Sequence, residues 1–258
     1  MTKIYEAAAA GDLKLIQKYQ KDGADLNKPD DDGYTLLHWA SQFGHIALVK
    51  FLLDHGAKVN ASDNEGFTPI EVAIVTENAE VANLLIDVNR KNSANTDEDT
   101  WLHVAAAHGQ TEVLRKLLDS ELDVSNKADD GRTPLHWATQ ENRVETVRYL
   151  LNEGASPNAK DEEGFAPVHI ASSDGNVELL QLFANYGADF ELQCDFDDHA
   201  TPLHNACAWS KIEAVKFLLS KNVNVNATDD EGRTPLYFAK DSEQVELIQI
   251  LKSAGAKE

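Results

Sequence analysis

Residues 129–136 read DDGRTPLH, and the second half of this stretch recurs along the chain of 258 residues. The other copies of that half begin at Thr35, Thr68, Thr100, Ala166, Thr201 and Thr234. With Thr133 included, the successive starting positions are 33, 32, 33, 33, 35 and 33 residues apart. One phrase at one nearly fixed period indicates a solenoid, in which each repeat packs only on its neighbours.

The chemistry of one repeat can be followed from Gly131 onward. Glycine adopts positive φ without steric cost, so Gly131 favours a tight turn at the tip of a loop. Thr133 suits the position that caps a helix, and Pro134 suits the first helical position, where a missing N–H costs nothing. The spacing of apolar residues then predicts a first helix over residues 134–141 and a second helix over residues 144–152.

The phrase T-P-L-H-x-A at a period near 33 residues resembles the ankyrin-repeat family. The resemblance implies an all-α repeat solenoid of stacked helix-turn-helix units with protruding β-hairpin loops. It covers essentially the whole chain, so we expect a single domain over residues 1–258. The expected repeats are 1–29 as an amino-terminal cap, 30–62, 63–94, 95–127, 128–160, 161–195, 196–228, and 229–258 as a carboxy-terminal cap.

Two regions depart from the pattern. Around residues 77–99 one repeat is a residue short, Glu77 and Asn89 replace expected glycines, and Glu71 replaces the expected histidine. We expect this junction to be the least stable or least regular one, with neutral drift as the other explanation. Two extra residues within Cys194–His199 lengthen one loop, either as a specific contact or as a tolerated insertion.

The chain is strongly acidic. Lys and Arg number 23 against 44 Asp and Glu, which gives a net charge of −21. Such a chain repels phosphate backbones and anionic lipids, so we expect neither nucleic acid nor a membrane as partner. A protein with a Lys- and Arg-rich surface is the better match, and the charge together with polar capped ends favours a monomer. We find no apolar run of transmembrane length and no signal-peptide pattern.

The spacing of the histidines indicates a structural role and not a metal-binding site. One stands at the same place in most repeats: His38, His103, His136, His169 and His204. Ligands of one metal must lie within a few ångströms of each other, which positions one repeat apart do not allow. In the resembled family this histidine hydrogen-bonds within and between neighbouring loops. We therefore expect no metal, no other cofactor and no catalytic residues.

Only two cysteines, Cys194 and Cys207, are present. Two cysteines argue against a disulfide framework and favour a reducing location, the cytoplasm or alternatively the nucleus. We expect Cys207 to be a small buried side chain. Cys194 lies in the lengthened loop, where it can be exposed, and a remote alternative function is an enzyme that uses this thiol.

Acidic residues gather at the predicted loop tips, as at residues 30–32, 129–130 and 229–231. Aspartate favours turns because its side chain bonds the local backbone, and this explains one carboxylate per tip but not two or three. If stacking aligns the tips, as the resemblance implies, the additional carboxylates form a negative stripe. Such a stripe would speed the encounter with a basic partner and make binding sensitive to salt.

Aromatic residues accompany the tips. In the resembled family, the residue after the tip glycine and the end of the first helix face a concave groove, where exposed aromatic side chains are typical anchors. Packing on the neighbouring loop is the alternative for Phe67 and Phe165. Trp39 and Trp137 are expected between repeats in the core, and Trp101 could be either. The candidate protein-binding residues are Asp31, Asp32, Tyr34, Phe43, Glu65, Phe67, His108, Asp130, Arg132, Glu141, Glu163, Phe165, Asp174, Asp198, Trp209 and Arg233.

The sequence thus predicts a non-catalytic protein–protein interaction module that binds a basic partner protein through an acidic and aromatic concave groove. An adaptor, an inhibitor and an assembly chaperone all fit this prediction. A regulatory subunit of an enzyme complex is the alternative. A purely mechanical spacer would instead leave partner binding unchanged when Phe43 or Trp209 is replaced by alanine.

Overall fold

The computed structural model describes residues 3–91, 98–119, 122–195 and 199–257. These residues form helices joined by turns and contain no β-strand. Contacts within the chain define two compact units, Met1–Leu122 and Asp123–Glu258. The all-α repeat fold is confirmed, and the loop tips expected as β-hairpins are turns without regular strands in the described part. The single domain over residues 1–258 stays a prediction.

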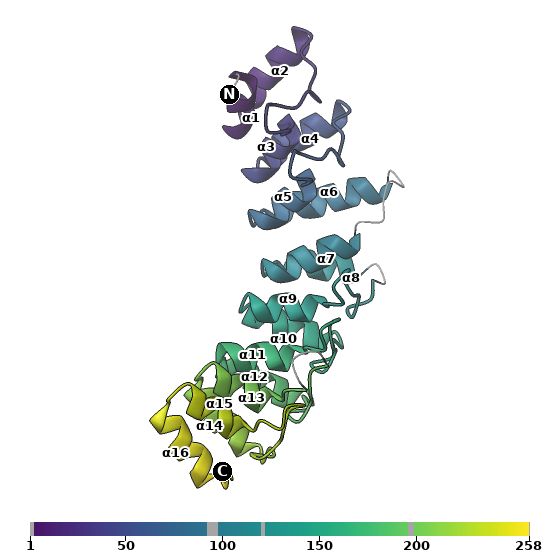
Figure 1. Ribbon diagram of the computed structural model, residues 1–258. Helices are drawn as coiled ribbons and strands as arrows, with labels where there is room; N and C mark the ends of the chain where they lie inside the picture. The colour runs from purple at the N-terminus through teal and green to yellow at the C-terminus, as the bar shows by residue number, and fades with distance from the viewer. Residues whose placement is uncertain (1–2, 92–97, 120–121, 196–198, 258) are drawn as a thin grey trace. The chain divides into compact units, whose positions relative to one another are not determined.

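The first unit is built from four helix pairs (Figure 1). The first helix of each repeat packs on the second helix of the same repeat and on the first helix of the next, as α3 packs on α4 and α5. The helices are α1 (Lys3–Ala9), α2 (Leu13–Lys21), α3 (Leu36–Gln42), α4 (Ile46–Asp54), α5 (Pro69–Val75), α6 (Ala79–Lys91), α7 (Glu98–Ala107) and α8 (Thr111–Leu118).

The second unit repeats the same arrangement, and α11 packs on α9, α12 and α13. Its helices are α9 (Pro134–Gln140), α10 (Val144–Asn152), α11 (Pro167–Asp174), α12 (Val177–Asn185), α13 (Pro202–Ala208), α14 (Ile212–Ser220), α15 (Pro235–Asp241) and α16 (Val245–Ser253). The helices predicted over residues 134–141 and 144–152 are confirmed to within one residue.

Most repeat histidines join their own helix start to the next loop, whereas Nδ1 of His103 lies 2.6 Å from the carbonyl oxygen of Asp99 in its own helix. The Thr133 N–H donates to Nδ1 of His136 at 3.0 Å, and Nε2 of His136 lies 3.1 Å from the carbonyl oxygen of Phe165. A backbone N–H only donates and a carbonyl only accepts, so the ring is neutral and carries its proton on Nε2. The same pair of bonds occurs at His38, His169 and His204. The structural role expected for these histidines is confirmed.

Asparagine side chains form a second kind of joint between repeats. Nδ2 of Asn158 donates to the carbonyl of Gly187 at 3.1 Å, and its Oδ1 accepts from the N–H of Asp189 at 2.8 Å. Asn27 and Asn226 bridge in the same way, and in all three cases the partners lie 29 and 31 residues further along the chain. The amide thereby satisfies one acceptor and one donor of the adjacent repeat.

One aspartate per loop closes the tip. Oδ1 of Asp161 accepts from the backbone N–H groups of Glu163 and Phe165 at 3.1 and 2.8 Å. Asp30, Asp63 and Asp229 do the same for residues two and four positions later. Turn chemistry therefore accounts for the first carboxylate of these tips, as the sequence predicts, and the later carboxylates need another explanation.

Ala128 stands at the position that Asp30, Asp63, Asp161 and Asp229 occupy in their loops. The indole Nε1 of Trp137 is buried there and has no hydrogen-bond partner in the described chain. In the repeat 30–62, by contrast, the indole Nε1 of Trp39 donates to Oδ2 of Asp30 at 2.8 Å.

Replacing Ala128 by aspartate is expected to raise the free energy of unfolding by about 1 kcal/mol, because the carboxylate satisfies backbone donors and the indole. Urea unfolding measures the change. Ala128→Asn is the control, since its amide oxygen can close the loop without adding a charge. A lower stability in both variants would contradict the assignment.

The junction around residues 77–99 differs from the sequence expectation. Asn89 does not end a helix: it lies inside α6, is fully buried, and its Nδ2 donates to Oδ1 of Asn60 at 2.5 Å. Glu71 does replace the histidine at the helix start, since its Oε2 accepts from the Thr68 N–H at 2.7 Å. The expectation for Asn89 was wrong because its partner lies 29 residues away.

Two further expectations about buried residues are corrected. Trp39 and Trp137 are only half-buried, whereas Trp101 is 1% exposed and belongs to the core. Cys194 is fully buried although it begins the lengthened loop, whose residues 196–198 lie outside the described chain. Cys207 is buried as predicted, and burial raises the pKa of its thiol.

Candidate protein-binding surface

Neighbouring loop tips are joined by backbone hydrogen bonds. The Asn64 N–H donates to the carbonyl of Asp32 at 3.1 Å, and in the second unit the Glu162 N–H donates to the carbonyl of Asp130 at 3.0 Å. Gly33, at φ +85°, makes this approach possible, because a Cβ there would lie 2.6 Å from the Asn64 nitrogen. The tips therefore lie side by side in these pairs, as the sequence analysis expected.

The candidate residues differ in exposure, and Asp198 lies outside the described chain. Exposed candidates are Asp31, Asp32, Phe43, Glu65, Phe67, Asp130, Glu141, Glu163, Asp174 and Trp209. Half-buried candidates are Tyr34, His108, Arg132, Phe165 and Arg233. Among the aromatic candidates, Phe43, Phe67 and Trp209 expose 50%, 40% and 65% of their surface. Phe165 instead packs its ring edge-on against His169, at 5.9 Å between ring centres.

In the second unit, basic side chains pair with carboxylates of the loop tips. Nε of Arg132 lies 3.7 Å from Asp130 and 3.5 Å from Asp161. Arg233 lies 2.7 Å from Asp229 and 2.8 Å from Glu231. The chain's own cations thus partly neutralise the acidic tips of this unit.

Three tip carboxylates of the first unit pair with no cation of the described chain, although Glu98 pairs with Arg90 at 2.8 Å. Asp32, Asp63 and Glu65 form no ion pair with a basic side chain of the described residues. They line a cleft of about 320 Å³ together with Tyr34, Trp39, Gln42 and Asn64. The pKa of Tyr34 is raised, first by burial and then by Asp63, Glu65, Asp30 and Asp32. The hydroxyl therefore lies in a negative potential.

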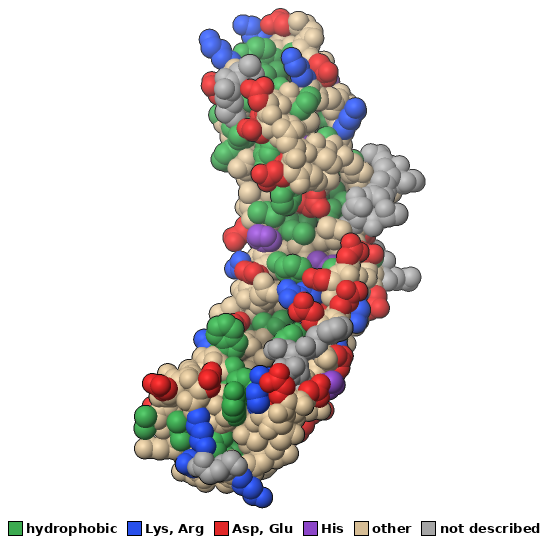
Figure 2. All heavy atoms as spheres, in the orientation of Figure 1, with side chains coloured by type: hydrophobic (Ala, Val, Ile, Leu, Met, Phe, Trp, Pro, Cys, Tyr) green, Lys and Arg blue, Asp and Glu red, His purple; other side chains and the backbone are tan. Residues whose placement is uncertain are grey.

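A row of aromatic rings leads from this cleft to the end of α3. The ring centres of Tyr34 and Trp39 are 5.2 Å apart, and Trp39 is stacked on Phe43 at 6.2 Å with an interplanar angle of 7°. We call Asp32, Tyr34, Trp39, Phe43, Glu65 and Phe67 the acidic–aromatic surface. Acidic and hydrophobic side chains also lie next to one another on the visible face of the first unit in Figure 2.

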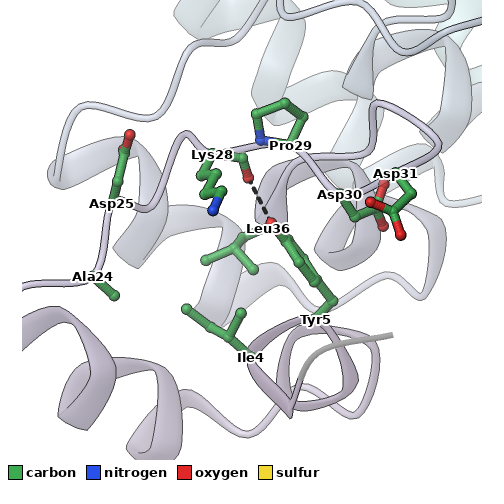
Figure 3. A pocket seen from close by; sticks show the side chains of 9 residues that line it. All are labelled: Ile4, Tyr5, Ala24, Asp25, Lys28, Pro29, Asp30, Asp31 and Leu36. Atoms are coloured by element: carbon green, nitrogen blue, oxygen red, sulfur yellow. Dashed lines mark hydrogen bonds between the residues drawn. The ribbon is translucent and has the colours of Figure 1, made fainter.

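A second cavity, of about 420 Å³, lies at the amino-terminal repeat. Figure 3 shows Tyr5 and Ile4 of α1 facing the loop that contains Lys28, and the Tyr5 hydroxyl donates to the Lys28 carbonyl at 3.1 Å. Asp31 lines this cavity, whereas Asp32 lines the cleft beside Tyr34. The two neighbouring carboxylates therefore line different cavities.

In the described ranges, the His, Cys, Asp and Glu side chains form no group of three or more that could hold a metal ion. The helices of these ranges include none that is both long and apolar enough to cross a membrane.

The chain matches the family model for ankyrin repeats, in three copies, over residues 4–95, 87–161 and 163–258. Human Rabankyrin-5 is 48% identical over 56 residues, which are 22% of this chain and 5% of that protein. The ankyrin repeat domain-containing protein oryK of Aspergillus oryzae is 35% identical over 54 residues, or 21% of this chain and 9% of oryK. Human transient receptor potential cation channel subfamily A member 1 is 36% identical over 59 residues, or 23% of this chain and 5% of the channel.

Each of these matches therefore spans less than a tenth of the relative's length. Ankyrin repeats are generally protein–protein interaction modules, and the family is typically non-catalytic. The repeated phrase, the stacked helix pairs and the family model agree, so this chain belongs to the ankyrin-repeat family.

Proposed function

We propose that the chain is a non-catalytic module that binds a partner protein with a basic surface through its acidic–aromatic surface. The observation that carries the proposal is the exposure of Phe43 and Phe67, at 50% and 40%, beside tip carboxylates that lack a cation. Exposed aromatic side chains are typical anchors of protein interfaces. Unpaired carboxylates attract a Lys- or Arg-rich surface and set its orientation.

The cysteines support the non-catalytic part of the proposal. A reactive cysteine is accessible and has a lowered pKa. Cys194 and Cys207 are both buried, and burial raises the pKa of Cys207. An enzyme that uses Cys194 therefore has little support. Two buried cysteines agree with the proposed reducing compartment. Action as a monomer, and the role of adaptor, inhibitor, chaperone or regulatory subunit, belong to the same proposal.

The double variant Phe43→Ala/Phe67→Ala is expected to weaken partner binding by at least about tenfold, as loss of interface anchors does. Capture from a lysate identifies partners, and titration calorimetry with the purified partner then measures the affinity. Tyr186→Ala/Tyr237→Ala is the matched control, because these rings are 37% and 50% exposed in the second unit. This control should bind normally.

Two results would contradict the proposal. A partner whose affinity does not fall with rising salt would show that the carboxylates serve only the turns. Binding that survives the Phe43/Phe67 double variant but fails in the Tyr186/Tyr237 control would place the interface on the other unit.

A further inference from the structure

The repeats 30–62 and 128–160 can be compared position by position, with an offset of 98 residues between them. Among the positions that are identical in the two repeats and the loops that follow them are these four: Asp32 and Asp130, Trp39 and Trp137, Gln42 and Gln140, Asp63 and Asp161. A fifth position beside these side chains differs. The repeat 30–62 has Tyr34 where the repeat 128–160 has Arg132. The chain therefore contains one set of side chains twice, once with an arginine and once without it.

Arg132 engages all four members of its set. Its Nε lies 3.7 Å from Oδ2 of Asp130 and 3.5 Å from Oδ2 of Asp161. Its Nη1 donates to Oε1 of Gln140 at 2.9 Å, and its Cζ lies 5.6 Å from the centre of the Trp137 ring. Two carboxylates, an amide oxygen and an aromatic face are the groups that a guanidinium prefers. We call this set a guanidinium site.

Arg233 in the last repeat supports the comparison. It occupies the same position after its tip glycine and pairs with Asp229 and Glu231. Its Cζ lies 5.1 Å from the centre of the Phe238 ring. Two repeats thus place an arginine at this position, against acidic tip residues and the aromatic side chain five residues later.

The corresponding set in the repeat 30–62 has its acceptors but no cation. Oε1 of Gln42 is buried and has no hydrogen-bond partner in the described chain, whereas Oε1 of Gln140 accepts from Arg132. Nothing basic within the described ranges pairs with Asp32 or Asp63. A buried oxygen without a donor is unfavourable by comparison with a bonded one, so a ligand that supplies the donor is favoured.

The cleft leaves room for such a ligand. Tyr34 covers Trp39 at 5.2 Å, much as Arg132 covers Trp137, and about 320 Å³ remain beside the Tyr34 ring. Glu65 adds a further carboxylate, and the Asn64 amide already donates to the Asp31 carbonyl at 2.9 Å. The lining therefore offers several acceptors, and its occupant must supply several donors.

We propose that this cleft binds the guanidinium group of an arginine side chain carried by the partner protein, an inference that rests on the proposed function. The planar fork of arginine can bond the Asp32 and Glu65 carboxylates and the Gln42 oxygen while it stacks on the Tyr34 ring. A lysine ammonium forms fewer directed bonds and does not stack as a plane.

The test titrates the protein with N-acetyl-L-arginine amide as the probe at low salt. Binding is measured by NMR as the chemical-shift change of the Trp39 indole N–H. N-acetyl-L-lysine amide and N-acetyl-L-citrulline amide are the comparison probes, since citrulline keeps the shape of arginine without its charge. We expect saturable shifts with arginine, weaker binding of lysine, and citrulline binding about tenfold or more weaker because charge-assisted bonds are lost. Equal shifts with citrulline and arginine would overturn the inference.

A matched pair of variants separates the cleft from the general negative field. Asp32→Asn and Asp31→Asn each remove one charge from the same tip, but only Asp32 lines the cleft. Gln42→Ala removes the buried acceptor. Asp32→Asn and Gln42→Ala are expected to weaken the arginine probe severalfold, and Asp31→Asn to leave it nearly unchanged. Equal losses in Asp31→Asn and Asp32→Asn would mean that charge alone attracts the probe.

The variant Tyr34→Arg copies the repeat 128–160 and fills the cleft from within the chain. It is expected to abolish probe binding without lowering the free energy of unfolding. If the probe still binds this variant, the cleft is not its site.

If the probe does not bind but the partner binds normally and its binding depends on Phe43, only the arginine inference is overturned. Specific probe binding without any partner at the acidic–aromatic surface overturns only the proposed function.

Discussion

Lowering the pH from about 6.5 to 4 is expected to reduce the free energy of unfolding by about 3 kcal/mol through His169 alone. The pKa of this histidine falls from 6.5 to about 4 in the folded chain, chiefly because the ring is buried. Below pH 6.5 the unfolded chain therefore binds a proton that the folded chain does not. The stabilisation is fully present above pH 6.5, falls as the pH falls, and levels off below about 4.

The hydrogen bonds of His169 explain why its second proton is excluded. Nδ1 accepts from the Ala166 N–H at 3.0 Å, and Nε2 lies 2.9 Å from the carbonyl oxygen of Leu192. A proton on Nδ1 would place one N–H against another. His38, His136 and His204 also have lowered pKa values, again chiefly through burial. The free energy of unfolding that is lost through these three histidines adds to the loss through His169. Acid should therefore unfold the repeats that these rings join.

Urea unfolding at several pH values between neutrality and 4 checks this prediction. The informative comparison is the slope of unfolding free energy against pH in the wild type and in His169→Gln, because the variant lacks the titrating ring. The slope should be smaller in His169→Gln. Equal slopes in the wild type and His169→Gln would show that His169 does not contribute to the acid response.

Trp101→Ala is expected to lower the free energy of unfolding by about 3–5 kcal/mol, the usual range for truncating a buried aromatic side chain. Trp101 is 1% exposed and lies in α7, which packs on both α5 and α8. α7 begins at Glu98, three residues before the position where five other repeats have their proline. The tryptophan thus fills the core of its repeat, and the packed helices cannot close around the space it would leave.

Hydrogen exchange followed by mass spectrometry can locate this loss, since the affected helices belong to the unit Met1–Leu122. Protection should fall in α5, α7 and α8. Trp209→Ala is the matched control, because this tryptophan is 65% exposed and its removal should change stability by no more than about 0.5 kcal/mol. Similar losses in both variants would contradict the core assignment of Trp101.

Most helix limits could be predicted because they depend on neighbouring residues. Thr133 and Pro134 determine where α9 begins, whichever repeat lies next to it. Tip aspartates could be assigned for the same reason, since Asp161 bonds the backbone only two and four residues away. Local chemistry of this kind is visible in the order of the residues.

What could not be predicted depends on partners in a neighbouring repeat. Asn89 resembles a substituted helix stop, but it is held inside α6 by Asn60 of the preceding repeat. Trp39 and Trp137 share one phrase, yet both rings are only half-buried and lie beside the loop residues Tyr34 and Arg132. The guanidinium site needs Asp161 from the following loop beside Arg132, and one repeat read alone does not contain it.

The asparagine joints have a consequence for how such a chain can change its length. Asn27, Asn158 and Asn226 reach their partners across the same 29 and 31 residues, wherever they stand in the chain. Removing or duplicating one complete period brings an equivalent carbonyl and an equivalent N–H opposite each amide, whereas removing a fraction of a period does not. A gene that encodes these joints can therefore grow or shrink by unequal recombination in whole-repeat steps, and every remaining asparagine joint is preserved.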